Sequence, residues 1–185
     1  MKVACLGDSI TGGSSGGVLA AFPQRLETLL GPSHVVGNYG VAGNTISQIQ
    51  TRWTSTVRSR GHTHLVLLGG LNDLRVGTAG ATIYTTWSAI ADEAKLDGLV
   101  VVAVTVLPWK NFLTQWTAAR QTETEALNTS IRAWVSTTAV LVDGYALFGG
   151  ADPTIMSASY DSGDNGHPNQ AGADYLARLV LGAIT

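Results

Sequence analysis

Residues 3–13 read VACLGDSITGG, an apolar run that breaks off into Gly-Asp-Ser. Consecutive apolar residues without polar alternation are typical of a strand that is buried on both faces of a parallel sheet. The glycines that follow favour a sharp turn, and such a turn would lift the side chain of Ser9 above the sheet edge. Gly, Asp and Ser are also frequent in turns for backbone reasons alone, so this stretch fits either a nucleophilic serine or a simple turn.

The rest of the chain alternates between apolar runs and segments with helical spacing. The runs predict further strands at residues 34–39, 65–68, 99–107 and 139–142. Loops are expected at 14–17 and 144–166, and helices are expected to start near Pro23, after a cap at Asn44 or Thr45, near Ile83, at Trp116 and at Pro168. Because parallel neighbours need helical crossovers, the sequence predicts a five-stranded, doubly wound α/β fold in a single domain over residues 1–185.

The composition argues against several classes of protein. Charged residues make up only 13% of the chain and the formal net charge is −2, which gives no electrostatic footprint for nucleic acid or an anionic membrane. The single Cys5 excludes an internal disulfide and is expected to pack inertly in the first strand. We find no membrane-spanning apolar run and no signal peptide, so export would need a separate leader. The low-charge, Thr-rich surface would suit an extracellular or virion-associated setting.

Candidate catalytic residues follow the ends of the expected strands, where doubly wound folds bind their ligands. Serine is a poor nucleophile at neutral pH, so it needs a base within hydrogen-bond reach and an acceptor that orients this base. Of the four histidines, only His167 follows the carboxyl end of an expected strand. Asp164 precedes it by three residues, and a tight turn through Asn165 and Gly166 would set the Asp164 carboxylate on the imidazole.

The remaining histidines, His34, His62 and His64, are expected at the opposite rim of the sheet. No carboxylate or cysteine stands near the His-Thr-His pair, so we interpret it as surface and predict no metal site. Acyl transfer also needs hydrogen-bond donors where negative charge develops on the carbonyl oxygen. Gly43 offers a backbone N–H and Asn72 a side-chain amide, although each by itself is more often an ordinary turn residue.

Four segments stand out together: GDSIT at 7–11, NYGVAGNT at 38–45, GGLND at 69–73 and DNGHPN at 164–169. In order and spacing they resemble the four sequence blocks of the SGNH hydrolases, also called GDSL esterases or lipases. The resemblance implies a three-layer α/β/α, flavodoxin-like fold and serine-dependent ester hydrolysis without a metal or cofactor. It also implies that Ser9 is the nucleophile, His167 the base and Asp164 its partner. The Ser9 N–H, the Gly43 N–H and the Asn72 amide would then form the oxyanion hole.

Two positions depart from the family pattern. Leu71 stands where the family usually has Thr, and this should be tolerated because Asn72 and Asp73 are retained. Asn165-Gly166 replaces the commoner Gly followed by an aliphatic residue, and this change affects the turn that sets Asp164 on the histidine. Asp161, six residues before the histidine, is the alternative orienting residue.

The substrate is predicted less directly. Trp109, Phe112 and Trp116 follow the fourth strand and would suit the lining of an acyl or sugar pocket, although Phe112 and Trp116 fit the packing of the next helix equally well. Because the family includes carbohydrate O-deacetylases, we expect an esterase for short acyl groups, with O-acetyl groups of a carbohydrate as one candidate. A thioesterase, lysophospholipase or acyltransferase would use the same triad. The alternative of another class is a non-catalytic glycan-binding module.

A cofactor-binding module is a further alternative, with the glycine-rich loop at 12–17 around a phosphate or flavin. This loop lacks both the Gly-Lys-Ser/Thr of a P-loop and the spaced glycines of a dinucleotide-binding motif. We therefore predict no cofactor.

Overall fold

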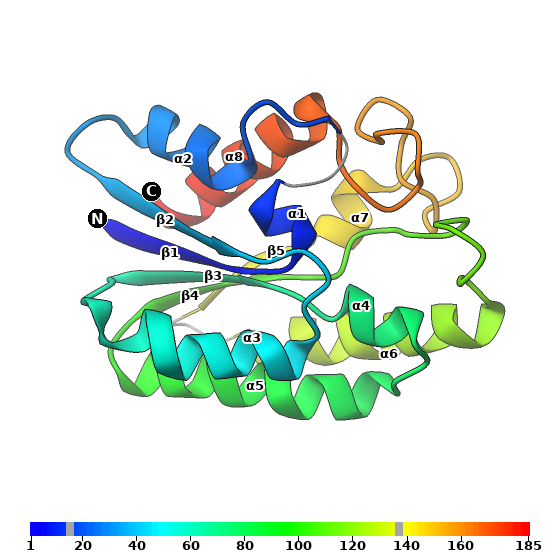
Figure 1. Ribbon diagram of the computed structural model, residues 1–185, viewed down its shortest axis with the longest axis horizontal. Helices are drawn as coiled ribbons and strands as arrows, with labels where there is room; N and C mark the ends of the chain where they lie inside the picture. The colour runs from blue at the N-terminus through cyan, green and yellow to red at the C-terminus, as the bar shows by residue number, and fades with distance from the viewer. Residues whose placement is uncertain (14–16, 136–138) are drawn as a thin grey trace.

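The computed structural model describes residues 1–13, 17–135 and 139–185, and a parallel sheet forms its centre (Figure 1). Within these residues, five strands lie in the order β2-β1-β3-β4-β5, and every neighbouring pair is parallel. The strands are β1 (Lys2–Gly7), β2 (Val35–Gly40), β3 (His64–Leu68), β4 (Val100–Val104) and β5 (Ala139–Val142). The predicted five-stranded parallel sheet is therefore confirmed.

Helices cover both faces of the sheet and give the three layers that the family resemblance implied (Figure 1). One face carries α2 (Phe22–Leu30) and α8 (Gln170–Ile184), which pack against each other. The opposite face carries α3 (Ile46–Arg52), α5 (Gly80–Leu96) and α6 (Ala118–Trp134). A π-helix, η1 (Trp53–Val57), and a 3-10 turn, η2 (Arg58–Arg60), continue α3.

Helix α5 illustrates how residue spacing builds the core. Ile83, Trp87, Ile90 and Ala94 recur at the helical period and are all fully buried, as the sequence predicts. Trp87 also packs edge-on against Trp134 of α6, with the ring centroids 5.3 Å apart. Burying a large apolar side chain contributes about 1.5–3 kcal/mol, so this face fixes α5 on the sheet.

Three short helices begin near the carboxyl ends of the strands. They are α1 (Ser9–Gly12) after β1, α4 (Leu71–Arg75) after β3 and α7 (Gly144–Phe148) after β5. The chain runs from β1 to β2 on one side and then to β3 on the other, so the order of the strands reverses at β1. Ligands of doubly wound sheets bind at such a reversal, which here lies next to Ser9.

The structure corrects several predicted boundaries. Residues 144–166 are not all loop, because Asp143 caps α7 by accepting the Ala146 N–H. The fourth strand ends at Val104 rather than at 107, and the residues that follow stay buried while leaving the sheet.

Two helices begin two residues later than predicted. Thr117 caps α6, and Asn169 caps α8, so Trp116 and Pro168 precede these helices. The loop predicted at 14–17 falls largely outside the described residues. Within the described chain, no helix has the length and apolar character needed to cross a membrane.

Candidate active site

Ser9 is the first residue of α1 and is separated from the end of β1 only by Asp8. The Asp8 carboxylate caps this helix by accepting the Ile10 N–H at 3.0 Å, and Gly13 ends it in the left-handed conformation with a φ of 70°. The sharp turn expected here is therefore a one-turn helix. It leaves Ser9 7% exposed at the carboxyl edge of the sheet.

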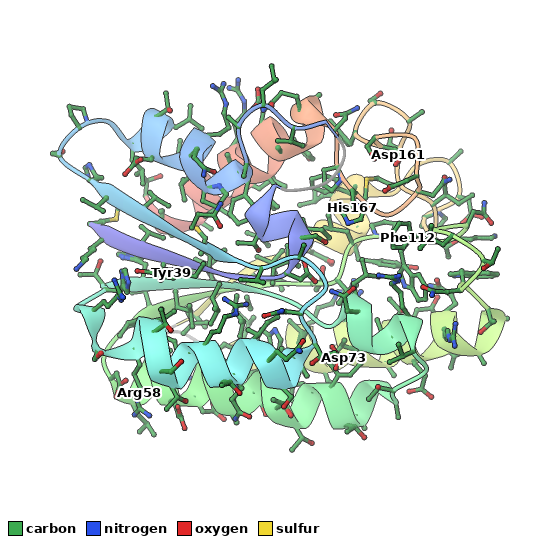
Figure 2. All side chains as sticks on the ribbon, in the orientation of Figure 1. Tyr39, Arg58, Asp73, Phe112, Asp161 and His167 are labelled. Carbon is green, nitrogen blue, oxygen red and sulfur yellow. The ribbon has the colours of Figure 1, made fainter. Side chains whose placement is uncertain are left out.

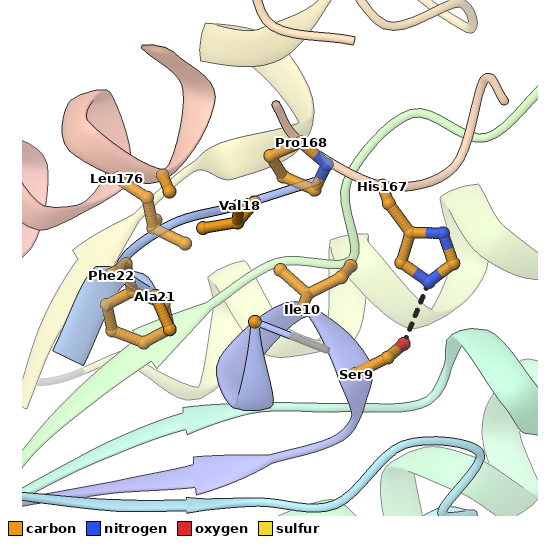
Figure 3. Close-up of a pocket in the computed structure, with 10 residues that line it drawn as sticks. Ser9, Ile10, Val18, Ala21, Phe22, His167, Pro168 and Leu176 are labelled. Carbon is orange, nitrogen blue, oxygen red and sulfur yellow. Dashed lines mark hydrogen bonds between the residues drawn. The ribbon is translucent and has the colours of Figure 1, made fainter. Parts of the chain in front are cut away.

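Three side chains from distant parts of the sequence form a hydrogen-bonded series. Ser9 Oγ lies 2.9 Å from His167 Nε2 (Figure 3), and His167 Nδ1 lies 2.6 Å from Asp164 Oδ2. A carboxylate can only accept, so the proton of the neutral imidazole belongs on Nδ1, and Nε2 is left to accept from the serine hydroxyl. This arrangement can transfer a proton from Ser9 to His167.

The turn between Asp164 and His167 holds the carboxylate in place. Asp164 Oδ1 accepts the backbone N–H groups of Gly166 at 2.9 Å and of His167 at 2.8 Å. Burial alone would raise the pKa of Asp164, but the hydrogen bonds from the His167 ring and from these two N–H groups outweigh it. The pKa of Asp164 therefore lies below its ordinary value, and the carboxyl is ionised at neutral pH.

The unusual Asn165-Gly166 pair fits this turn. Asn165 has a φ of 63°, a left-handed conformation that Asn adopts more readily than most residues. Asp161 accepts the Asn165 N–H at 3.0 Å. The structure therefore places Asp164 on the ring of His167 and Asp161 on the backbone of the turn.

Gly43 and Asn72 follow β2 and β3, the strands on either side of β1, so both lie at the same sheet edge as Ser9. Gly43 has a φ of 77°, which favours glycine, and apart from its chain neighbours no atom of the described residues lies within 4 Å of the position a Cβ would take. Asn72 is 8% exposed and belongs to α4 rather than to a turn. Its Nδ2 donates to the Asn44 carbonyl at 3.0 Å.

Residues 5–175 match the model of the GDSL-like lipase/acylhydrolase family. The chain belongs to this family. Membership supports a hydrolase of ester bonds, and the match spans all the elements that carry the candidate residues. A comparison with curated protein sequences gives no match.

Solved structures of GDSL proteins share the fold. A GDSL-like lipase from Bacteroides thetaiotaomicron has a TM-score of 0.83 at 22% identity, and the match covers 99% of this chain and 87% of that one. A putative lipolytic protein of the G-D-S-L family from Desulfitobacterium hafniense has a TM-score of 0.82 at 16% identity, with 99% of both chains covered. An acetyl xylan esterase has a TM-score of 0.74 at 20% identity, with 100% of both chains covered. The predicted fold class is therefore confirmed.

In this GDSL protein, the three aromatic residues predicted to line a pocket lie in surroundings that differ from one residue to the next. Trp109 is fully buried and donates from Nε1 to Thr124 Oγ1 at 2.9 Å, so it belongs to the core. Phe112 is 4% exposed and packs edge-on against the His167 ring, with centroids 5.1 Å apart. Figure 2 shows Phe112 and His167 together beyond the carboxyl ends of the strands. A side chain at Gly166 would lie 2.4 Å from the Phe112 ring, so glycine allows this contact.

Of these three aromatic residues, Trp116 is the one that is partly exposed. Its Nε1 donates to Gln121 Oε1 at 3.2 Å, and the Lys110 ammonium lies 5.4 Å from its ring centroid. It also packs against the hydrophobic core. These contacts favour helix packing for Trp116.

Two charged residues beneath the site are not predicted from the sequence: Asp8, which is buried, and Arg52, which is half-buried. Asp8 is 1% exposed, and burial raises its pKa to about 6, although the Ile10 N–H and the nearby His167 act in the opposite direction. Arg52 donates to the Gly7 carbonyl at 2.7 Å and to Asn44 Oδ1 at 2.8 Å, and it also reaches the Tyr39 carbonyl. Burial lowers the pKa of Arg52, and the Asp8 carboxylate opposes this shift.

A small apolar pocket opens beside Ser9 and His167 (Figure 3). Its walls come from α1, α2, α8 and the segments that precede α2 and α8, and they include Ile10, Val18, Phe22, Pro168 and Leu176. Its volume of about 10 Å³ corresponds to the room for about one water molecule.

The other histidines lie away from this site. His62 was expected at the surface, but it is 8% exposed, and its Nε2 lies 3.1 Å from the Tyr39 hydroxyl. Across residues 1–13, 17–135 and 139–185, no three His, Cys, Asp or Glu side chains gather closely enough to hold a metal ion.

Proposed function

We propose that this chain hydrolyses carboxylic esters of short acyl groups, with Ser9 as nucleophile, His167 as base and Asp164 as the residue that orients it. The observation that carries the proposal is the hydrogen-bonded series from Ser9 Oγ through the imidazole to Asp164, at 2.9 and 2.6 Å. Both distances are within hydrogen-bond reach, as proton transfer from a serine requires.

The reaction runs through an acyl-enzyme. Ser9 Oγ attacks the ester carbonyl while its proton moves to His167 Nε2, and the ionised Asp164 stabilises the imidazolium that forms. Hydrogen bonds from the Ser9 and Gly43 N–H groups and from the Asn72 amide stabilise the negative charge on the former carbonyl oxygen. His167 then donates its proton to the leaving alcohol. A water molecule, activated by the same imidazole, releases the acid and restores Ser9.

The pocket beside Ser9 supports a short acyl group, because its apolar walls leave room for little more than a methyl group. An acetyl group therefore suits it better than a long chain. The similarity in fold to an acetyl xylan esterase agrees with an O-acetyl group on a carbohydrate as substrate.

A series of p-nitrophenyl esters from acetyl to octanoyl, together with acetylated xylan, tests this function on wild type and Ser9→Ala. We expect the highest kcat/KM for the shortest esters, loss of activity in Ser9→Ala, and full activity in EDTA. Activity that persists in Ser9→Ala contradicts the mechanism, and a preference for octanoyl contradicts the substrate class. Acetyl-CoA is assayed beside these esters, and a higher kcat/KM for it would favour the thioesterase alternative. Binding of acetylated xylan without turnover would favour a glycan-binding module.

A further inference from the structure

Hydrogen bonds hold both ends of the Asn72 amide, with a donor at its oxygen and an acceptor at its nitrogen. Its Oδ1 accepts from Arg75 Nη1 at 2.9 Å, and its Nδ2 donates to the Asn44 carbonyl at 3.0 Å. A guanidinium has no acceptor and a carbonyl has no donor, so both contacts allow only one of the two orientations of the amide. Nδ2 carries two hydrogens, and one of them remains for another acceptor.

Arg75 is itself held in place by the loop that follows β4. Its Nε donates to Gln115 Oε1 at 2.7 Å, and its guanidinium lies 5.0 Å from the centroid of the Phe112 ring. Phe112 in turn packs edge-on against His167. The side chain of Arg75 therefore lies between the candidate oxyanion donor and the aromatic ring that supports the base.

We propose that Arg75 is a positioning residue of the oxyanion hole, a role that rests on the proposed function. It sets the Asn72 amide with the free Nδ2 hydrogen available to the transition-state oxygen. The positive charge of the Arg75 guanidinium, which donates to Asn72 Oδ1, also polarises the amide. A polarised amide is a stronger hydrogen-bond donor. Arg75 acts through Asn72 and makes no contact of its own with the reacting ester.

The expected effect is a fall in kcat with an unchanged KM. Removing an oxyanion donor lowers kcat by about 10²–10³, and Arg75→Met should lower it by less, about 10-fold, because Asn72 is still present. Met keeps the packing on Phe112 but supplies neither donor nor charge. Arg75→Lys keeps the charge and one donor, so it should recover part of the loss.

A double-mutant cycle separates positioning from general damage. If Arg75 acts through Asn72, the variant that combines Arg75→Met with Asn72→Ala should be no slower than Asn72→Ala alone. A purely structural effect of Arg75 would lower kcat in both backgrounds. Arg178→Met is the matched control, because Arg178 is an exposed arginine on α8, and it should leave kcat unchanged.

The outcomes are distinct from those that test the proposed function. If wild type hydrolyses short esters through Ser9 but Arg75→Met retains normal kcat, this inference is wrong and the proposed function stands. Additive losses in the double variant, or a loss seen only in KM, also overturn it. If Arg75→Met does not fold, Arg75→Lys measured with and without Asn72→Ala gives the same comparison. If Ser9→Ala retains full activity, the proposed function has failed.

Discussion

The carboxylate of Asp164 accepts three hydrogen bonds, one from the His167 ring and two from the turn between them. Asp161 bonds to the backbone of the turn and not to the imidazole, because its Oδ1 accepts the Asn165 N–H. At the scale of single residues, this difference separates the two aspartates that the sequence leaves as alternatives. Only one of them holds the imidazole.

Asp164→Asn should lower kcat by up to about 10⁴, because an amide can favour the wrong imidazole tautomer and cannot stabilise the imidazolium. Asp161→Asn should stay close to wild type, because its amide oxygen can still accept the Asn165 N–H. Steady-state hydrolysis of a short activated ester measures both, and thermal unfolding confirms that each variant is folded. If Asp161→Asn loses most of its kcat while Asp164→Asn keeps a normal kcat, the orienting residue is misassigned.

At the scale of elements, Arg52 joins three segments that meet beneath the site. It contacts the ends of β1 and β2 through the Gly7 and Tyr39 carbonyls, and it contacts the loop after β2 through Asn44. The Asn44 carbonyl accepts in turn from Asn72. One side chain of α3 therefore braces the loop that carries Gly43 and the acceptor that holds the Asn72 amide.

Arg52→Met should lower both stability and activity. The free energy of unfolding should fall by about 2–3 kcal/mol, because partly buried acceptors lose their charged donor. The value of kcat should also fall, because the loop with Gly43 is no longer fixed to the ends of the two strands. Urea unfolding and ester hydrolysis measure the two effects, with Arg178→Met as the control for loss of an exposed arginine. An unchanged urea midpoint would show that these contacts do not brace the loop.

Residue spacing predicts the elements of this fold well where they are long. The α5 pattern of Ile83, Trp87, Ile90 and Ala94 marks one buried face, and the apolar strands are equally clear. Helix α7 has only five residues, too few for a periodic pattern, so it was missed. The residue type of Trp109 favours a pocket, whereas its hydrogen bond to Thr124 of α6 holds it in the core.

At the scale of the whole molecule, the sheet brings together residues far apart in the sequence. The order β2-β1-β3 sets the segments that carry Gly43 and Asn72 on either side of Ser9, and the turn before α8 adds His167. Short motifs predict which residue types gather there. Contacts such as Arg75 with Asn72 and Arg52 with Gly7 depend on where helices settle, so they become visible only in the structure.

The same edge holds a buried acid whose ionisation opposes folding. Burial raises the pKa of Asp8 from 3.8 to about 6, and one of its oxygens, Oδ2, has no hydrogen-bond partner among the described residues. The charged groups that act on Asp8 or lie against it are His167, Asp73 and Arg52. Because the folded state holds this proton to a higher pH than the unfolded chain, ionisation of Asp8 lowers stability as pH rises from about 4 to about 6.

Asp8→Asn should therefore become more stable relative to wild type as pH rises. Its amide oxygen can still accept the Ile10 N–H, and any cost of burying the new amide is the same at every pH. The difference in unfolding free energy between variant and wild type should grow by about 3 kcal/mol from pH 4 to pH 7, the equivalent of about two pKa units. Urea unfolding at several pH values measures it. Asp97→Asn is the control, because hydrogen bonding to Arg58 lowers the pKa of Asp97: its difference should change with the opposite sign and only below about pH 4, and should stay nearly constant from pH 4 to pH 7. A difference for Asp8→Asn that stays constant with pH would mean that Asp8 does not titrate in this range.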